Sequence, residues 1–254
     1  MNLESRIGPE CYGTAFWMAG IYNPEFPFNQ MGELASDVCR NLRTLAISIL
    51  SVHGKVDGFY HNLIRSGRVR ERYLTRCVGE GHLEDHHRSS GWYSAFIDTL
   101  AAGEFDLARK IADLSPGDFR PGHEYEDDYC YVQLIHGLIG AEKRPAQDLL
   151  GEFEAYVEDE ANARLDVVRS LLEKSQANFD ESFAGLLQDH QRQIDAEIEA
   201  GRFEDVHVNA DRRIFIEGLA ILRLAEKVGL QTQEEYLFCP SVARLPMLVP
   251  FPGE

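Results

Sequence analysis

The fold class is decided by one stretch near the end of the chain, Arg212-Arg-Ile-Phe-Ile-Glu-Gly-Leu-Ala-Ile-Leu-Arg-Leu-Ala-Glu-Lys-Val-Gly229. At 3.6 residues per turn, its apolar and small residues fall on one broad face and its charged residues on the other. The pattern predicts one helix over residues 212–229, with Leu222 in the core. Gly229 is expected to end it in a left-handed conformation, because glycine has no Cβ to oppose a positive φ. The predicted buried face comprises Ile214, Phe215, Gly218, Ile221, Leu222, Ala225 and Val228.

The same spacing continues outward from this stretch. Residues 33–63 predict one long helix or two joined helices, and residues 92–116 predict two helices joined at Ala102-Gly103 and stopped by Pro116. Similar pairs follow, over residues 129–139 with 145–157 and residues 161–174 with 179–200.

These pairs begin at a spacing of roughly thirty to forty residues, which is typical of tetratricopeptide-like arrays. The predicted fold is therefore all-α: a single domain over residues 1–254, built as a degenerate array of antiparallel helical hairpins. Sustained alternation of apolar and polar residues is absent, so no substantial sheet is expected.

Residues 1–30 do not follow this pattern. Aromatic residues and prolines alternate there, as in Phe16, Trp17, Pro24 and Pro27. The segment is predicted to be irregular and extended, packed against the helical domain.

The C-terminal third carries a resemblance to a known family. A helix rich in Leu, Ile and Ala is followed by Gly229-Leu230, a polar spacer, an aromatic residue, Pro240 and an apolar tail. This order resembles the end of bacterial immunity proteins of the immunity protein 49 family, and the likeness is best from Phe179 to Leu245. The resemblance implies a non-catalytic partner of a polymorphic toxin, such as a type VI secretion effector, which it neutralises by direct binding.

The charge of the chain is strongly asymmetric. Residues 1–110 contain 12 Lys and Arg against 13 Asp and Glu, while residues 111–254 contain 13 against 29, within a total net charge of −17. Such a field disfavours nucleic acid and anionic membranes as partners and attracts cationic ones. The simpler alternative is that the acidic residues only solvate exposed helix faces.

Targeting and redox features point to the cytoplasm. No apolar run approaches the roughly twenty residues that span a bilayer, and the N-terminus lacks a basic region followed by an apolar one. The five cysteines are scattered without a Cys-x-x-Cys pair, which predicts reduced thiols. We therefore expect a soluble, cytoplasmic protein.

No catalytic or cofactor motif is present: the sequence lacks a nucleophile elbow, a P-loop and a dinucleotide glycine pattern. The best metal candidate is His82-Leu-Glu-Asp-His86-His87, where two imidazoles four residues apart would share a helix face. Its Gly- and Ser-rich flanks favour a solvated loop instead. We expect no enzyme, no cofactor and no metal.

The only basic cluster is Arg65-Ser-Gly-Arg-Val-Arg-Glu-Arg-Tyr-Leu-Thr-Arg76. It could hold phosphates, but no aromatic interleaving makes a platform on which bases could stack. Pairing with acidic helices of the same chain is the favoured interpretation.

Two acidic clusters are the candidate partner-binding residues. They are interleaved with large aromatic residues, which add contact area to charge. Helix capping and solvation are the simpler explanations, because carboxylates are favoured in the first turn of a helix. The candidates are Glu124, Glu126, Asp127, Asp128, Glu158, Asp159 and Glu160.

Three hypotheses of function follow. The first is an immunity protein that binds a cognate toxin and covers its active site, where a nuclease fits best because its substrate channel must be basic. The second is a helical-repeat scaffold or regulator that binds a protein or peptide. The third, a metal-dependent hydrolase using the His82 cluster, requires a bound metal.

Overall fold

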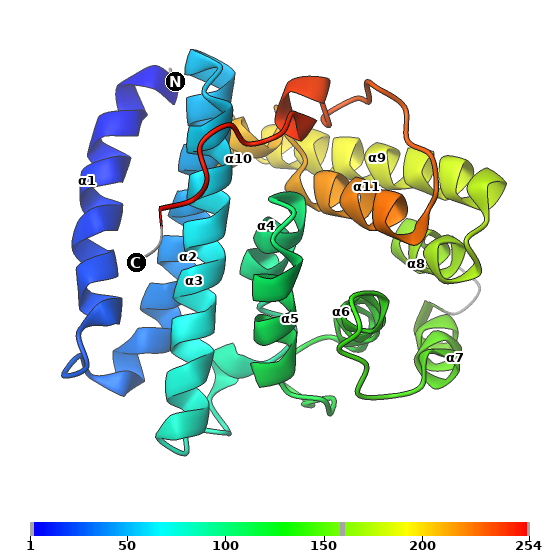
Figure 1. Ribbon diagram of the computed structural model, residues 1–254, viewed down its shortest axis with the longest axis horizontal. Coiled ribbons are helices and arrows are strands. Elements are labelled where there is room, and N and C mark those ends of the chain that lie inside the picture. The colour runs from blue at the N-terminus through cyan, green and yellow to red at the C-terminus, as the bar shows by residue number, and fades with distance from the viewer. Residues whose placement is uncertain (1–2, 158–160, 253–254) are drawn as a thin grey trace.

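The computed structural model describes residues 3–157 and 161–252 and confirms the all-α fold class. Within these residues the chain forms helices and no strand (Figure 1). The α-helices are α1 Leu3–Tyr22, α2 Phe28–His53, α3 Val56–Gly79, α4 Ser94–Ala101, α5 Phe105–Leu114, α6 Glu126–Leu138, α7 Ala146–Val157, α8 Ala163–Glu173, α9 Gln176–Glu199, α10 Val206–Asp211 and α11 Ile216–Val228. Three 3-10 helices join them, η1 His86–Arg88, η2 Arg202–Glu204 and η3 Ser241–Arg244.

The helices follow one another across the molecule and then return (Figure 1). Helices α1 to α3 lie at one end, α4 and α5 in the middle, and α6 to α8 at the other end. Consecutive helices pack as α2 with α3, α4 with α5, α6 with α7 and α8 with α9. The chain then folds back, so that α10 packs on α2 and α11 on α4. A linear repeat array lacks such closing contacts, and the repeat period stays a prediction.

The N-terminal segment is the clearest correction. Residues 3–22 form a helix rather than an extended segment, although Pro9 lies inside it. The helix packs on α2 and α3 through a face that includes Thr14, Met18 and Ile21 at helical spacing. The aromatic residues that suggested irregular structure, such as Phe16, point to solvent and take no part in this face.

The closing helix is shorter than predicted, because α11 begins at Ile216 rather than at Arg212, and residues 212–215 form the turn between α10 and α11. The backbone N–H of Phe215 donates to Phe238 O at 2.8 Å, so this turn pairs with the tail instead of continuing a helix. The predicted burial of Leu222 is confirmed, since its exposed fraction is 0%. Gly229 ends α11 with φ 96°, as expected.

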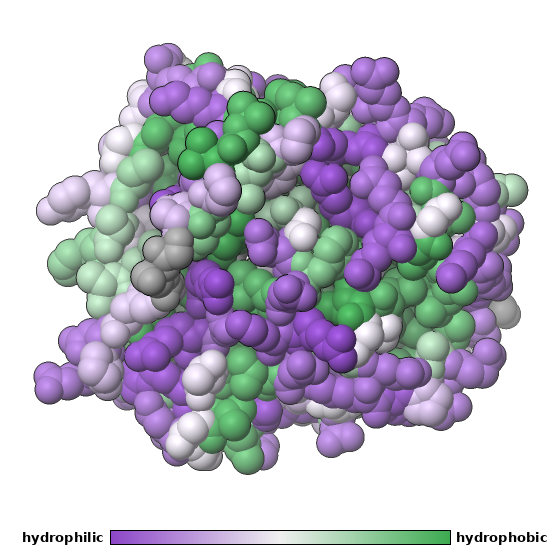
Figure 2. Space-filling model, in the orientation of Figure 1, coloured by the Kyte–Doolittle hydropathy of each residue, from purple (hydrophilic) through white to green (hydrophobic). Residues whose placement is uncertain are grey.

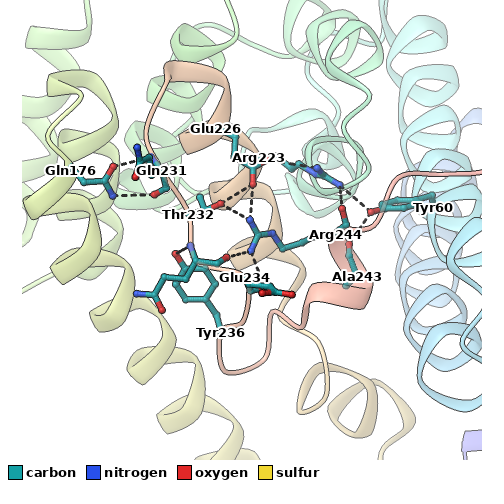
Figure 3. A network of polar contacts seen from close by, with 11 residues as sticks. Tyr60, Gln176, Arg223, Glu226, Gln231, Thr232, Glu234, Tyr236, Ala243 and Arg244 are labelled. Atoms are coloured by element: carbon teal, nitrogen blue, oxygen red, sulfur yellow. Dashed lines mark hydrogen bonds and ion pairs between the residues drawn. The ribbon is translucent and has the colours of Figure 1, made fainter.

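The tail after α11 is tied to the helices by a polar network (Figure 3). Gln176 on α9 bonds both backbone groups of Gln231, at 2.8 and 3.0 Å. Glu226 accepts hydrogen bonds from Thr232 at 2.9 Å and from Arg244 at 2.7 Å. These bonds fix a segment that has almost no regular structure of its own.

A second part of this network anchors the tail to α3. The buried Tyr60 hydroxyl lies 2.9 Å from Ala243 O and 2.7 Å from Leu245 O, and it accepts from Arg223 Nη2 at 3.0 Å (Figure 3). Further along, Asp57 accepts the backbone N–H of Leu248 at 2.7 Å. Apolar side chains gather at the upper left of this face, where the tail crosses α3 (Figure 2).

Candidate functional site

The predicted acidic residues 124–128 lie at the start of α6, beside a hollow of about 550 Å³. We call it the α6 hollow. Its walls come from η1, from the residues before α4 and from the loop that leads into α6. They are formed by His86, Gly91, Trp92, Gly122, His123, Glu124, Tyr125 and Asp128.

Glu124 has an internal role in this hollow. Its carboxylate accepts the backbone N–H of Gly91 at 2.9 Å and of Arg120 at 3.1 Å, which joins the loop before α4 to the loop before α6. Burial raises the pKa of Glu124, and the backbone donors oppose that rise. This carboxylate holds the hollow in shape and has little capacity left for a partner.

Asp128 is also engaged within the protein. Arg164 on α8 bonds it at 3.1 Å and forms two bonds of 2.9 Å to Glu217 on α11. The Tyr131 hydroxyl donates to Glu217 at 2.9 Å. Burial raises the pKa of Asp128, while Arg164 opposes the rise. The network links α6, α8 and α11, so Asp128 positions helices as well as lining the hollow.

Glu126 and Asp127 are the described candidates that remain available for a partner. Both lie in the first turn of α6, and no cation among the described residues pairs with either. The Glu126 carboxylate lies against Tyr156, and this hydrogen bond raises the pKa of Tyr156 to about 12. Tyr125 precedes them with 78% of its surface exposed. Charge and aromatic contact area therefore occur together. Glu158, Asp159 and Glu160 lie outside the described residues.

The histidine cluster is divided by the fold. His82 stacks on Phe28 with ring centroids 3.7 Å apart, whereas His86 lies in the α6 hollow with its Nδ1 3.2 Å from that of His123. Burial and the neighbouring imidazoles lower the pKa of His86. In the described part of the chain, no group of three or more His, Cys, Asp or Glu side chains is arranged to hold a metal ion.

The basic cluster lies on α3, and its pairing is internal but differs from the expected one. Arg68 pairs with Glu71 at 2.9 Å and Arg76 with Glu80 at 2.5 Å, so these partners lie on the same helix or at its end. Arg70 is buried and donates to backbone carbonyls of η1 and the residue after it. The expected pairing with acidic helices elsewhere is wrong for these three arginines.

The cysteines are free thiols, and all except Cys11 are buried. Burial raises the pKa of Cys39, Cys130 and Cys239 to about 12, so these thiols are protonated and poor nucleophiles near neutral pH. No helix in residues 3–157 and 161–252 has both the length and the apolar character to span a membrane.

Sequence patterns missed several residues of this region. Trp92, Arg164 and Glu217 come from segments distant in sequence from the acidic turn, and only the packing of the loop before α4, of α8 and of α11 brings them near it. The one available signal was Glu217, a carboxylate in the first turn of an otherwise apolar helix.

A comparison with protein families gives one match. The family model described as Immunity protein 49 matches residues 44–243, which include every described candidate residue and all helices from α3 to α11. No curated protein and no solved structure matches the chain.

Proposed function

Since the chain belongs to the immunity protein 49 family, we propose that it neutralises a cognate bacterial toxin by binding it directly and covering its active site. The family makes it an immunity protein, and such proteins are generally not enzymes. The family match over residues 44–243 is the observation that carries the proposal. Action in the cytoplasm, where a toxin meets its targets, belongs to the same proposal.

The α6 hollow is the proposed contact region. It is lined by the exposed Tyr125 and the partly buried Trp92, and Glu126 and Asp127 follow Tyr125 in the first turn of α6. Aromatic residues next to charges are typical of the residues that carry binding energy at interfaces. The excess of acidic over basic residues after residue 110 favours a cationic partner surface. A nuclease fits this description best, because its substrate channel must attract phosphates.

The first experiment uses the gene neighbourhood. Expression of the toxin-like gene beside this one should arrest cell growth, and co-expression of this protein should restore growth through a complex that survives gel filtration. A scaffold protein of unrelated role would neither restore growth nor form that complex, and the proposal would then fail.

The second experiment tests the contact region by charge reversal. Glu126→Lys with Asp127→Lys should slow association with the toxin several-fold at low salt, because like charges now meet across the interface. Glu158→Lys, Asp159→Lys and Glu160→Lys form a second variant. Glu124 and Asp128 are left unchanged, since both hold the fold.

A matched control carries the same charge change elsewhere. Glu25→Lys with Glu33→Lys alters two exposed acidic residues that precede the family-matched range. This control should associate at nearly the rate of the parent protein. If the control and the Glu126/Asp127 variant associate equally slowly, the association rate depends on net charge and not on the position of these residues.

A further inference from the structure

A second concave region forms where the C-terminal helices close on the N-terminal ones. A cleft of about 410 Å³ lies between α2, the start of α4, and α9 to α11, and a neighbouring cavity of about 310 Å³ shares four of its residues. The shared residues are Arg43, Ser94, His207 and Asp211. We call the larger space the Asp211 cleft.

The Asp211 carboxylate has no partner in this cleft. Its backbone carbonyl is engaged by His190 Nε2 at 3.0 Å, but no described residue donates a hydrogen bond to the side chain or pairs with it within 4.0 Å. Burial raises the pKa of Asp211 to about 6, despite the opposing attraction of Arg43. Asp211 is partly buried and no cation among the described residues pairs with its carboxylate, so part of its hydration is lost without a partner to offset the cost.

The nearest cation is already committed to another acid. Arg43 Nε donates to Asp98 at 2.6 Å, its Nη2 donates to Ser94 O at 2.6 Å, and Ser66 completes the site by donating to Asp98 at 2.6 Å. The charge of Arg43 is therefore balanced by the fully buried Asp98. Asp211 receives only longer-range attraction from it.

The remaining arginines around the two cavities are committed as well. Arg164 pairs with Glu217 and Asp128, and Arg40 pairs with Asp37 at 3.0 Å. Arg70 lines the neighbouring cavity but directs its donors to backbone carbonyls. The Asp211 cleft therefore has negative charge in excess of its cations.

The other walls of the cleft suit a long side chain with a charged end. Ile97, Ile194, Ile214 and Ile216 contribute apolar surface, which can hold the methylene stem of lysine or arginine while its charged group reaches an acid. Tyr93 and Gln193 add polar atoms. One unpaired carboxylate beside apolar walls fits the charged end and apolar stem of lysine or arginine, and no metal-ligating group of three or more side chains lies among the described residues.

We infer that the Asp211 cleft receives a lysine or arginine side chain of the toxin, which pairs with the Asp211 carboxylate. The inference rests on the proposed function and names the chemistry of the residue that the toxin presents. It makes Asp211 a specificity residue that is left unpaired in the free protein and paired in the complex.

The test is Asp211→Asn, measured in two ways at pH 7.5. Affinity for the toxin of the adjacent gene should fall about tenfold or more, because one partner of a buried charge pair is removed. The melting temperature of the free variant should rise, because a partly buried charge that has no partner is removed. A carboxylate that only supports the fold would instead give a lower melting temperature.

A control variant and the possible outcomes separate failure of this inference from failure of the proposed function. Glu181→Gln neutralises an exposed acid on α9, beyond the first turn of that helix, and should leave both measurements unchanged. Parent-like affinity of Asp211→Asn would overturn the inference while leaving toxin neutralisation intact. If the parent protein neither binds nor protects, the proposed function fails, and a second probe still decides the chemistry of the cleft.

That probe is N-acetyl-L-arginine amide at millimolar concentration, followed by carbon NMR of the Asp211 carboxyl group. The probe should lower the measured pKa of Asp211 below its value in the free protein, since a bound guanidinium favours the ionised acid. The Asp211→Asn protein should show no specific shift at the walls of the cleft. An unchanged pKa at saturating probe would overturn the inference.

Discussion

Leu222 shows how much one side chain of α11 contributes to stability. It is fully buried in the continuous core. Leu222→Ala should lower the free energy of unfolding by about 2–5 kcal/mol, through lost burial and the cavity left behind. Urea unfolding measures the change, with Leu248→Ala as control because that leucine is 82% exposed. An equal loss in both variants would contradict the assignment of Leu222 to the core.

Asp211 gives a pH dependence of stability with a definite sign. Its folded-state pKa rises from 3.8 to about 6, so between these values the folded protein keeps a proton that the unfolded chain releases. Stability should therefore fall as pH rises from about 4 to about 6, by up to about 3 kcal/mol from this group. The charged and titratable groups around it are Arg43, Tyr93, Asp98, Arg164, His190, Glu197, Asp205, His207 and Glu217.

The measurement is the difference in unfolding free energy between Asp211→Asn and the parent protein across this range. Because the amide cannot ionise, the difference should grow from pH 4 to pH 6 and then remain constant. A difference that does not vary with pH would show that Asp211 titrates normally in the folded protein.

Sequence patterns predicted the environment of Leu222 but not that of Asp211. The burial of Leu222 follows from the helical spacing of the apolar residues in α11, which is a local pattern. The environment of Asp211 depends on α10 folding back onto α2 and on the pairing of Arg43 with Asp98, which are contacts between distant segments. No spacing within one segment encodes them.

At the scale of the element, the tail after α11 is stabilised mainly by side-chain bonds. Tyr60→Phe removes the hydroxyl that joins α3, Arg223 and two tail carbonyls. The variant should be destabilised by about 1–3 kcal/mol, since buried polar groups lose their partner. Tyr12→Phe is the matched control, because that tyrosine is 81% exposed. Equal stability of the two variants would show that the tail is held by other contacts.

Helix α1 shows why the prediction of the first thirty residues was wrong. Prolines and exposed aromatic residues dominated the pattern, and Pro9 is unfavourable inside a helix. The buried set of Thr14, Met18 and Ile21 has helical spacing, but one of its members is polar. The signal was present, yet it was too weak to identify before the packing surface of α2 and α3 was known.

At the scale of the whole molecule, the charge asymmetry should determine the rate at which the toxin associates with the protein. Association rates of the parent protein are expected to fall as ionic strength rises, because screening shortens the reach of the acidic field. Dissociation rates should change less, since buried contacts determine them. Stopped-flow mixing at several salt concentrations measures both, and an association rate independent of salt would restrict the acidic charge to a role in solubility.

The acidic part of the chain does not form a separate half of the structure. Helices α10 and α11 pack on α2 and α4, so residues from both parts build the Asp211 cleft. The sequence predicted the all-α fold class correctly because most of the helices, unlike α1, have a clear apolar periodicity of their own. It did not predict the cleft, because the closure of the last helices on the first ones creates it.

The position of Trp92 allows partner binding to be followed by intrinsic tryptophan fluorescence. The chain has two tryptophans, and Trp92 lines both the α6 hollow and the cavity next to the Asp211 cleft, whereas Trp17 lies on α1. A Trp17→Phe protein would carry a single indole at the proposed contact region. Arrival of a partner would remove water from that indole and shift its emission to shorter wavelength, so occupancy of the surface becomes visible without any attached dye.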